Sequence, residues 1–168
     1  MEPTIRRITP DDWRILRELR LASLLDAPEA FGQSHTNALE MAESEWRQIA
    51  RSSAAGDGRI WLIATDGAAD VGLVQARRRA PADCMVFSMW VAPGARRRGV
   101  GALLIESVVE WAHTWGAQRL VLWVFGANEG AHQFYDRIGF QVIPDGPDAE
   151  SGKSFGAFAM ERLIPNSP

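Results

Sequence analysis

Residues 96–101 read Arg96-Arg97-Arg98-Gly99-Val100-Gly101, a basic, glycine-rich stretch between two apolar segments. The pattern predicts a strand over residues 83–92 before it and a helix after it that ends at Gly116. A turn from a strand into a helix leaves backbone N–H groups unpaired at the positive end of the helix dipole, where anions bind. Glycines let the backbone approach a phosphate closely, and arginines add charged donors. The stretch therefore predicts a diphosphate site.

The helix after this turn carries its apolar residues on one face. Leu104, Val108, Trp111 and Trp115 follow one another at the spacing of a buried helical stripe. The next segment, residues 119–125, is a nearly continuous apolar strand, which is typical of burial on both faces. Two such strands joined through a helix pair in parallel. The sequence therefore predicts a mixed α/β domain with strands 83–92 and 119–125 side by side.

The other elements are expected on both sides of this unit. Thr9 and Asp12 form a predicted capping box, with Pro10 at the first position of a helix that runs to about Leu25. The predicted buried face of that helix carries Ile15, Leu16, Leu19 and Ala22. Further expected elements are a strand at 4–8, a short helix at 44–50, a hairpin of strands 60–64 and 72–76, a helix from Asn128 to Gly139, and strands 140–143 and 155–163. Residues 52–58, 144–152 and the arginine run 77–79 are expected to be loops, and residues 28–42 have no clear assignment.

Composition limits the classes of function that need to be considered. The 168 residues suit one domain, and a net charge of -3 does not indicate general nucleic-acid binding. A single cysteine, Cys84, excludes an internal disulfide and suits a reducing cytoplasm. No apolar run approaches the roughly 20 residues of a membrane helix, so no membrane partner is expected. The three histidines, His35, His113 and His132, show no metal-ligand spacing, so no metal is expected.

Nucleotide-binding motifs are the alternative interpretations of the glycine-rich turn. The dinucleotide fingerprint requires a third glycine where this chain has Leu104, and an acidic residue where it has Phe125-Gly126. A nucleotide-binding regulatory domain is therefore a weaker alternative, supported by the turn alone.

Two motifs together resemble a known family. Arg96-x-x-Gly99-x-Gly101 resembles the Gln/Arg-x-x-Gly-x-Gly/Ala signature of the GNAT superfamily of acetyl-CoA-dependent N-acetyltransferases, and Met89-Trp90-Val91-Ala92-Pro93 is similar to that family's central strand. Asn128-x-x-Ala131-x-x-Phe134-Tyr135-x-x-x-Gly139-Phe140 resembles its second cofactor segment. The likeness covers nearly the whole chain. It implies a single GNAT-like domain over residues 1–168, with a mixed sheet flanked by helices and splayed between two parallel central strands.

The resemblance also implies a set of site residues. Main-chain groups of Met89 and Val91 would contact the acetyl carbonyl and the pantetheine arm, and the Asn128 side chain would bind the pantetheine region. The Met89 N–H would hold the oxyanion, and the Tyr135 hydroxyl would protonate the leaving sulfur. The backbone amides that would hold the pyrophosphate belong to Arg96, Arg97, Arg98, Gly99, Val100, Gly101 and Ala102.

The implied function is transfer of an acetyl group from acetyl-CoA to a primary amine of a small molecule, peptide or protein, by direct attack in a ternary complex. A homodimer in the cytoplasm is the expected setting, and the net charge mildly favours a cationic amine. The family's general base is doubtful here, because the neighbourhood reads Asp83-Cys84-Met85 with only Asp83 acidic. A chain of water molecules is a substitute for it. A non-catalytic acyl-CoA sensor is therefore the alternative function.

Overall fold

The computed structural model describes residues 2–56, 58–144, 146 and 156–165. In these residues seven strands form one mixed sheet in the order β1-β2-β3-β4-β5-β7-β6, which confirms the predicted α/β class. The strands are β1 (Thr4–Arg7), β2 (Arg59–Asp66), β3 (Ala69–Arg79), β4 (Asp83–Val91), β5 (Arg119–Phe125), β6 (Gln141–Ile143) and β7 (Ala157–Leu163). The helices are α1 (Trp13–Asp26), α2 (His35–Glu40), α3 (Glu43–Ala54), α4 (Val100–His113) and α5 (Glu129–Arg137), with short 3-10 turns η1 (Pro10–Asp12), η2 (Pro28–Ala30) and η3 (Pro93–Ala95).

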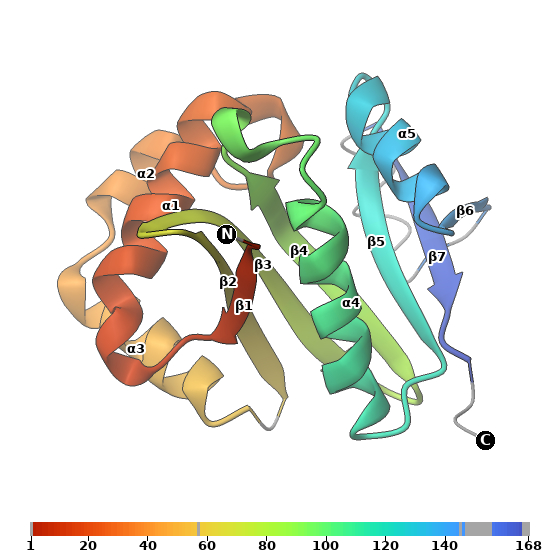
Figure 1. The fold of residues 1–168 in the computed structure, drawn as a ribbon, viewed down its shortest axis with the longest axis horizontal. Coiled ribbons are helices and arrows are strands. Elements are labelled where there is room, and N and C mark those ends of the chain that lie inside the picture. Colours follow the sequence, from red (N-terminus) through yellow and green to blue (C-terminus); the bar gives the residue numbers. More distant parts are fainter. Residues whose placement is uncertain (1, 57, 145, 147–155, 166–168) are drawn as a thin grey trace.

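The central strands β4 and β5 are parallel, as predicted, but they pair over a short distance only. Asp83–Met85 pairs with Arg119–Val121, and beyond these residues the two strands diverge (Figure 1). The Arg119 guanidinium bridges the closed end of this V, with 2.7 Å to Asp83 on β4 and 2.6 Å to Glu161 on β7. The sheet is thus splayed at its centre, as the family resemblance implies.

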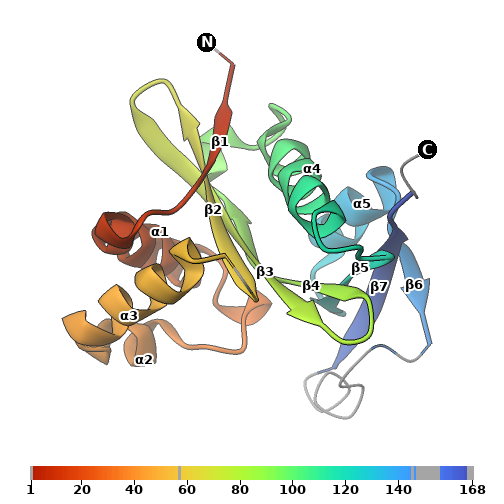
Figure 2. The ribbon, with the colours of Figure 1, turned by 90° about the horizontal axis from the view of Figure 1, so that it is seen from below.

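Helices cover both faces of the sheet. Figure 2 shows α1, α2 and α3 on one side and α4 and α5 on the other. Each side has its own hydrophobic core: Leu16, Trp46 and Ile63 belong to the first, and Leu104, Val108 and Phe140 to the second. The stripe predicted on α4 is confirmed, with Leu104 and Val108 fully buried. This arrangement fixes α1 and α4 against opposite faces of β3 and β4, where the site lies.

The first helix differs from its predicted form in two ways. Its first turn is the 3-10 turn η1, in which the Asp12 carboxylate accepts the Thr9 N–H at 2.6 Å, as the capping box predicts. Its buried face includes Leu16, Leu19 and Arg20, whereas Ala22 is exposed. Ala22 lies about 240° around the helix from Leu16, so it points away from the sheet while position 20 points toward it.

Two other expectations were wrong in their boundaries, the loop at 52–58 and the loop at 77–79. Helix α3 continues to Ala54, through part of the predicted loop 52–58, and the unassigned region holds α2, which Ser34 caps by accepting the Asn37 N–H at 3.1 Å. The arginines 77–79 are not a loop, because β3 pairs with β4 as far as Arg79 and Asp83. Most of the loop expected at 144–152, and the expected strand start at residue 155, lie outside the described residues.

No helix within the described ranges combines the length and the apolar composition that a bilayer crossing needs.

Candidate active site

Two cavities approach each other across the V. The first, here called the turn cavity, has a volume of ≈ 610 Å³ and is lined by Val91, Arg97, Gly99 and neighbouring residues. The second, here called the sheet cavity, has a volume of ≈ 660 Å³ and lies between β3, β4 and β5. The residues that line both cavities are Ala30, Phe31, Met89, Asn128, Ala131 and Tyr135. A molecule in one cavity therefore meets a molecule in the other at these six residues.

The turn itself presents backbone donors to the turn cavity. Gly99 precedes α4 at φ 83° and Arg97 has φ 61°, so both adopt the left-handed region. Leu103 is the first residue of this helix to return its N–H to the turn, with 3.0 Å to the Gly99 carbonyl. The N–H groups of Val100 to Ala102 precede the first intrahelical bond, as they do at any helix start, so they are available to an anion at the positive end of the helix dipole. The geometry fits the diphosphate site predicted from the sequence.

The three arginine side chains of the turn have different surroundings. Arg96 donates to the Val91 carbonyl at 2.8 Å and pairs with Asp26, and Arg98 pairs with Asp66 at 2.6 Å. Arg97 lines the turn cavity and has no ion pair with any described residue. Arg96 and Arg98 thus anchor the turn to the rest of the fold, whereas Arg97 is available to a ligand. A direct phosphate contact by any of them stays a prediction.

Gly101 has a packing role that the sequence did not reveal. A Cβ on this residue would lie 2.9 Å from Phe134 Cζ and 3.2 Å from Met89 Cε. Because real Cβ atoms do not approach that closely, only glycine lets α4 pack this tightly on α5 and on the centre of β4. Gly99 has no such neighbour, and its left-handed conformation is its reason for being glycine.

Met89 lies at a bulge in β4. Leu73 pairs with Trp90 and Gln75 pairs with Phe87, so β4 has one residue more than β3 between these two pairs. Ser88 adopts φ 52°, and a bulge of this kind leaves a residue outside the regular ladder and increases the local twist. The bulge occurs where the two cavities meet, so it re-aims the β4 backbone at the position expected to bind the acetyl carbonyl.

Asn128 and Tyr135 reach the same junction from α5. The Asn128 carboxamide caps the helix by accepting the Ala131 N–H at 3.0 Å, which confirms the predicted cap. Tyr135 is buried with its ring edge-on to Phe134 and Phe140, at centroid distances of 5.1 and 5.3 Å. Burial raises the pKa of the Tyr135 phenol. The raised pKa keeps the phenol protonated at neutral pH. The described residues offer its hydroxyl no hydrogen-bond partner, so it is available to a bound molecule as a donor.

The model of the acetyltransferase (GNAT) family matches residues 18–140. The chain belongs to the GNAT family. A 5-NmdU N-acetyltransferase of Pseudomonas phage PaMx11 is 30% identical over 123 residues, which are 68% of this chain and 85% of the phage protein. A mycothiol acetyltransferase of Corynebacterium diphtheriae is 39% identical over 62 residues, which are 37% of this chain and 20% of that protein.

Solved structures share the fold along nearly the whole chain. A GNAT acetyltransferase from Streptococcus pneumoniae superposes with a TM-score of 0.76 at 23% identity, covering 98% of this chain and 100% of the other. The PaiA N-acetyltransferase of Thermoplasma acidophilum, solved in complex with coenzyme A, gives a TM-score of 0.76 at 17% identity, covering 97% and 99%. This chain spans only 25% of a Methanocaldococcus jannaschii N-acetyltransferase that it matches, and about half of a Mycobacterium bovis one.

Asp83 and Cys84, at the start of β4, do not line either cavity of the candidate site. Asp83 forms its ion pair with Arg119, and it lines neither cavity. Cys84 is fully buried, and burial raises the pKa of its thiol to about 12, which makes it inert. Among the described lining residues Asp26 is the one carboxylate, and it already accepts from Trp90 and Arg96. No carboxylate among the described lining residues is therefore free to act as a general base.

The three histidines are also away from the site. His113 and His132 are exposed, and His35 lies on α2 outside both cavities. Within the described part of the chain no cluster of histidine, cysteine and acidic side chains is suited to a metal ion.

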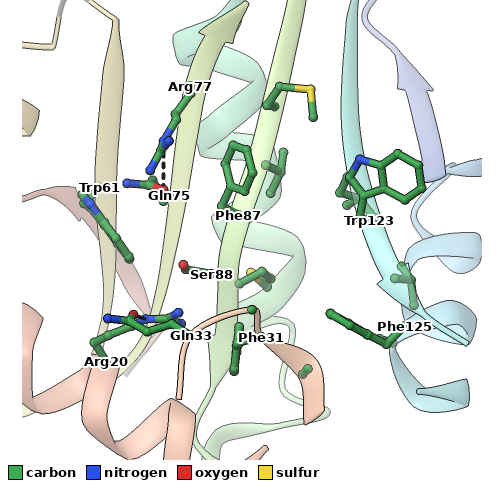
Figure 3. Close-up of a pocket in the computed structure, with 18 of the residues that line it drawn as sticks. Arg20, Phe31, Gln33, Trp61, Gln75, Arg77, Phe87, Ser88, Trp123 and Phe125 are labelled. Carbon is green, nitrogen blue, oxygen red and sulfur yellow. Dashed lines mark hydrogen bonds between the residues drawn. The ribbon is translucent and has the colours of Figure 1, made fainter. Parts of the chain in front are cut away.

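The sheet cavity is lined by polar and aromatic residues that sequence reasoning missed. Figure 3 shows Arg20 and Gln33 at one end of it, Arg77 and Gln75 toward the other, Trp61, Phe87 and Ser88 between them, and Trp123 and Phe125 on the opposite wall. Two signals were present in the sequence. Arg20 falls four residues after Leu16 on an otherwise apolar helix face, and Gln75 interrupts an apolar strand and is nevertheless buried.

Proposed function

We propose that this GNAT chain transfers the acetyl group of acetyl-CoA to a primary amine, by direct attack within a ternary complex. The observation that supports this most is the meeting of two cavities at Met89 and Tyr135, in the gap between β4 and β5. One cavity has the anion-binding turn, and the other is large enough for a separate small molecule or a peptide end.

The turn cavity suits the cofactor. The backbone donors that precede Leu103, together with the Arg97 guanidinium, provide for a diphosphate, and the splayed strands leave room for the pantetheine arm. Val91 and Asn128 lie along this path toward the junction. Acetyl-CoA supplies the activated thioester, and the residues of the chain bind and orient it.

The proposed reaction has three events at the junction. The neutral amine attacks the thioester carbonyl, a donor holds the oxygen while its negative charge develops, and the C–S bond then breaks. In this proposal the Met89 N–H at the bulge holds the oxygen and the Tyr135 hydroxyl serves the sulfur, which the position of both residues at the junction supports. The amine loses one proton and the departing sulfur gains one, giving the amide and free CoA thiol.

The pKa of Tyr135 refines its expected role. A phenol is a weaker acid than a thiol even before burial, and burial raises the phenol pKa further. Tyr135 therefore stabilises the departing sulfur through a hydrogen bond, and the proton that the thiol finally carries comes from the amine by way of solvent or the phenol.

The proposal is tested by measuring acetyl-CoA binding calorimetrically and thiol release with a panel of amines. Saturable binding together with amine-dependent thiol release supports it. Absence of heat with both acetyl-CoA and CoA would contradict the proposal as a whole.

A sensor that binds acyl-CoA without turnover is the second candidate, and the lack of a free carboxylate among the described lining residues favours it. Acetyl-CoA binding with no thiol release on any amine would select this reading. The homodimer, the cytoplasmic location and a single domain over residues 1–168 stay predictions.

A further inference from the structure

The sheet cavity carries a positive charge that the described part of the chain does not balance. Arg20, Arg59 and Arg77 line it, and none of its described lining residues is an aspartate or a glutamate. Within the described ranges none of the three guanidinium groups forms an ion pair. Water reaches Arg77, which is exposed, and Arg59, which is half-buried, whereas Arg20 is buried.

Arg20 is the most informative of the three, because it is buried. Its exposed fraction is 6%, and its described hydrogen-bond partners are the neutral side chains of Gln33 at 3.2 Å and Ser23 at 3.4 Å. Burial lowers the pKa of the Arg20 guanidinium to about 10. Burying a cation without an anion is costly, and proteins tolerate this cost chiefly where a function requires it.

Arg20 also lies close to the junction of the two cavities. Its guanidinium carbon is 4.6 Å from the centre of the Phe31 ring, and Phe31 lines both cavities. A group bound by Arg20 is therefore near the place where acetyl transfer is proposed. Figure 3 shows the Arg20, Gln33 and Phe31 side chains gathered at this end of the sheet cavity.

Arg59 and Arg77 extend the positive charge of the sheet cavity along β2 and β3. They are direct cross-strand partners on β2 and β3, a position where like charges destabilise a sheet. Desolvation, and then the charge of Arg59, lower the pKa of Arg77. Arg77 is held in place by Gln75, at 3.1 Å, and by the Phe87 ring, at 4.9 Å. The sheet therefore fixes a second cation over the cavity.

We propose that the acceptor is a primary amine that also carries an oxyanion, a carboxylate or a phosphate, and that Arg20 binds this oxyanion. The inference rests on the proposed acetyl transfer and specifies its acceptor. An amine that brings only a positive charge meets repulsion in this cavity, whereas an oxyanion compensates Arg20 through charge-assisted hydrogen bonds. The mild preference for a cationic amine that the net charge suggested has no support in the cavity.

The positive charge of these arginines also bears on the lack of a free carboxylate among the described lining residues. Nearby cations disfavour the ammonium form of a bound amine and lower its pKa. The acceptor then enters the reaction as the neutral nucleophile with less help from a carboxylate. Arg20 acts here as a specificity-determining residue, and it need not touch the reacting atoms.

The experiment compares acceptors in pairs that differ in the anionic group. L-phenylalanine is paired with phenethylamine for a carboxylate, and O-phosphoethanolamine with ethanolamine for a phosphate. The ratio of kcat/KM within each pair is measured for the wild-type protein, for Arg20→Met, and for the control Arg14→Met, which removes an exposed charge from the same helix outside both cavities.

We expect the wild-type protein and Arg14→Met to prefer the anionic member of at least one pair, and the pair preferred identifies the oxyanion. Arg20→Met should lower that preference about 10- to 100-fold, the usual worth of a hydrogen bond to a charged group. It should not lower the thermal midpoint, because it replaces an uncompensated buried charge by an apolar side chain of similar length. Equal rates within both pairs, or an unchanged preference in Arg20→Met, would overturn the inference.

Binding without turnover separates this inference from the proposed function. Thermal stabilisation of the protein by N-acetyl-L-phenylalanine, but not by N-acetylphenethylamine, and its loss in Arg20→Met, supports an oxyanion site even if no amine is acetylated. Equal stabilisation within this pair, and also within the pair of N-acetyl-O-phosphoethanolamine and N-acetylethanolamine, while acetyl-CoA binds and neutral amines are acetylated, contradicts the oxyanion site and leaves acetyl transfer intact.

Discussion

The Trp90 indole donates a hydrogen bond of 2.8 Å to the carboxylate of Asp26, and this contact joins the end of β4 to the end of α1. The same carboxylate pairs with Arg96 at the start of the cofactor turn. The hydrogen bond from Trp90, together with that from Arg96, holds the pKa of Asp26 below its ordinary value. The Asp26 side chain thus ties α1 to β4 and to the turn that the cofactor is proposed to contact.

Asp26→Asn should weaken acetyl-CoA binding. The amide cannot compensate the Arg96 charge, so the turn loses an anchor. We expect the Kd measured by calorimetry to rise about 3- to 10-fold, which is less than the full worth of a charge-assisted hydrogen bond because this contact acts on the cofactor only through the turn. Asp11→Asn, at an exposed position of η1, is the matched control and should bind normally. Folding lowers the pKa of Asp26, so the ionised carboxylate contributes to the free energy of unfolding. This contribution is complete above the ordinary pKa of 3.8 and is lost as the pH falls through the lower pKa of the folded chain. An unaltered Kd in Asp26→Asn would show that the turn keeps its shape without this anchor.

Gly101→Ala should lower both stability and activity. The added methyl group meets Phe134 and Met89 at 2.9 and 3.2 Å, and overpacking of this kind typically costs about 1–3 kcal/mol of unfolding free energy. The displacement falls mainly on Phe134, next to Tyr135 on α5, so kcat should fall even at temperatures where the variant is fully folded. Gly94→Ala is the control, because a Cβ there has no neighbour within 4 Å. Urea unfolding and steady-state kinetics check the two effects, and equal behaviour of the two variants would refute the packing argument.

Tyr135→Phe should lower kcat about 100-fold and leave the Kd for CoA nearly unchanged. The ring contacts with Phe134 and Phe140 remain, and only the hydroxyl proposed to serve the sulfur is removed. Gln133→Ala, which changes an exposed residue of the same helix, should have no effect. A normal kcat in Tyr135→Phe would remove the phenol from the mechanism while leaving the cofactor site as described.

The buried thiol of Cys84 should make the fold sensitive to alkaline pH. Below pH 9.0, the ordinary thiol pKa, neither the folded nor the unfolded chain is ionised at this residue; between there and the folded pKa of about 12 only the unfolded chain ionises. The free energy of unfolding should therefore fall as the pH rises through this window. Cys84→Ala should show a smaller fall between pH 8 and pH 10.5 in urea unfolding, by about 1–2 kcal/mol. Rapid alkylation of native Cys84 at pH 8 would contradict its burial.

Local patterns in the sequence predict the parts of this structure that depend on local forces. The glycine turn, the stripe on α4 and the Asn128 cap each follow from residues close together in the chain, and the structure contains all three. The sheet cavity is different, because its lining comes from segments far apart in sequence. Arg20 on α1 and Gln75 on β3 are visible in the sequence only as polar exceptions in apolar patterns, and nothing local shows that they lie in one cavity.

The splay of the sheet is likewise beyond local patterns. An apolar strand reads the same whether its ladder with a neighbour covers three residues or seven, so the short pairing of β4 with β5 came from the family resemblance alone. The partly buried ion pairs of Arg119, which hold the closed end together, also join three strands that are distant in sequence.

The divergence of β4 and β5 creates two inward-facing edges within a single sheet. Past Met85 and Val121 the described strands no longer bond to each other, although each still bonds to its outer neighbour. Amide protons along these edges should exchange with solvent faster than those of the outer ladders in the ligand-free protein. A bound molecule that supplies hydrogen-bond acceptors there slows this exchange and raises the melting temperature. The bound molecule then takes the place of the missing strand pairing and stabilises the sheet.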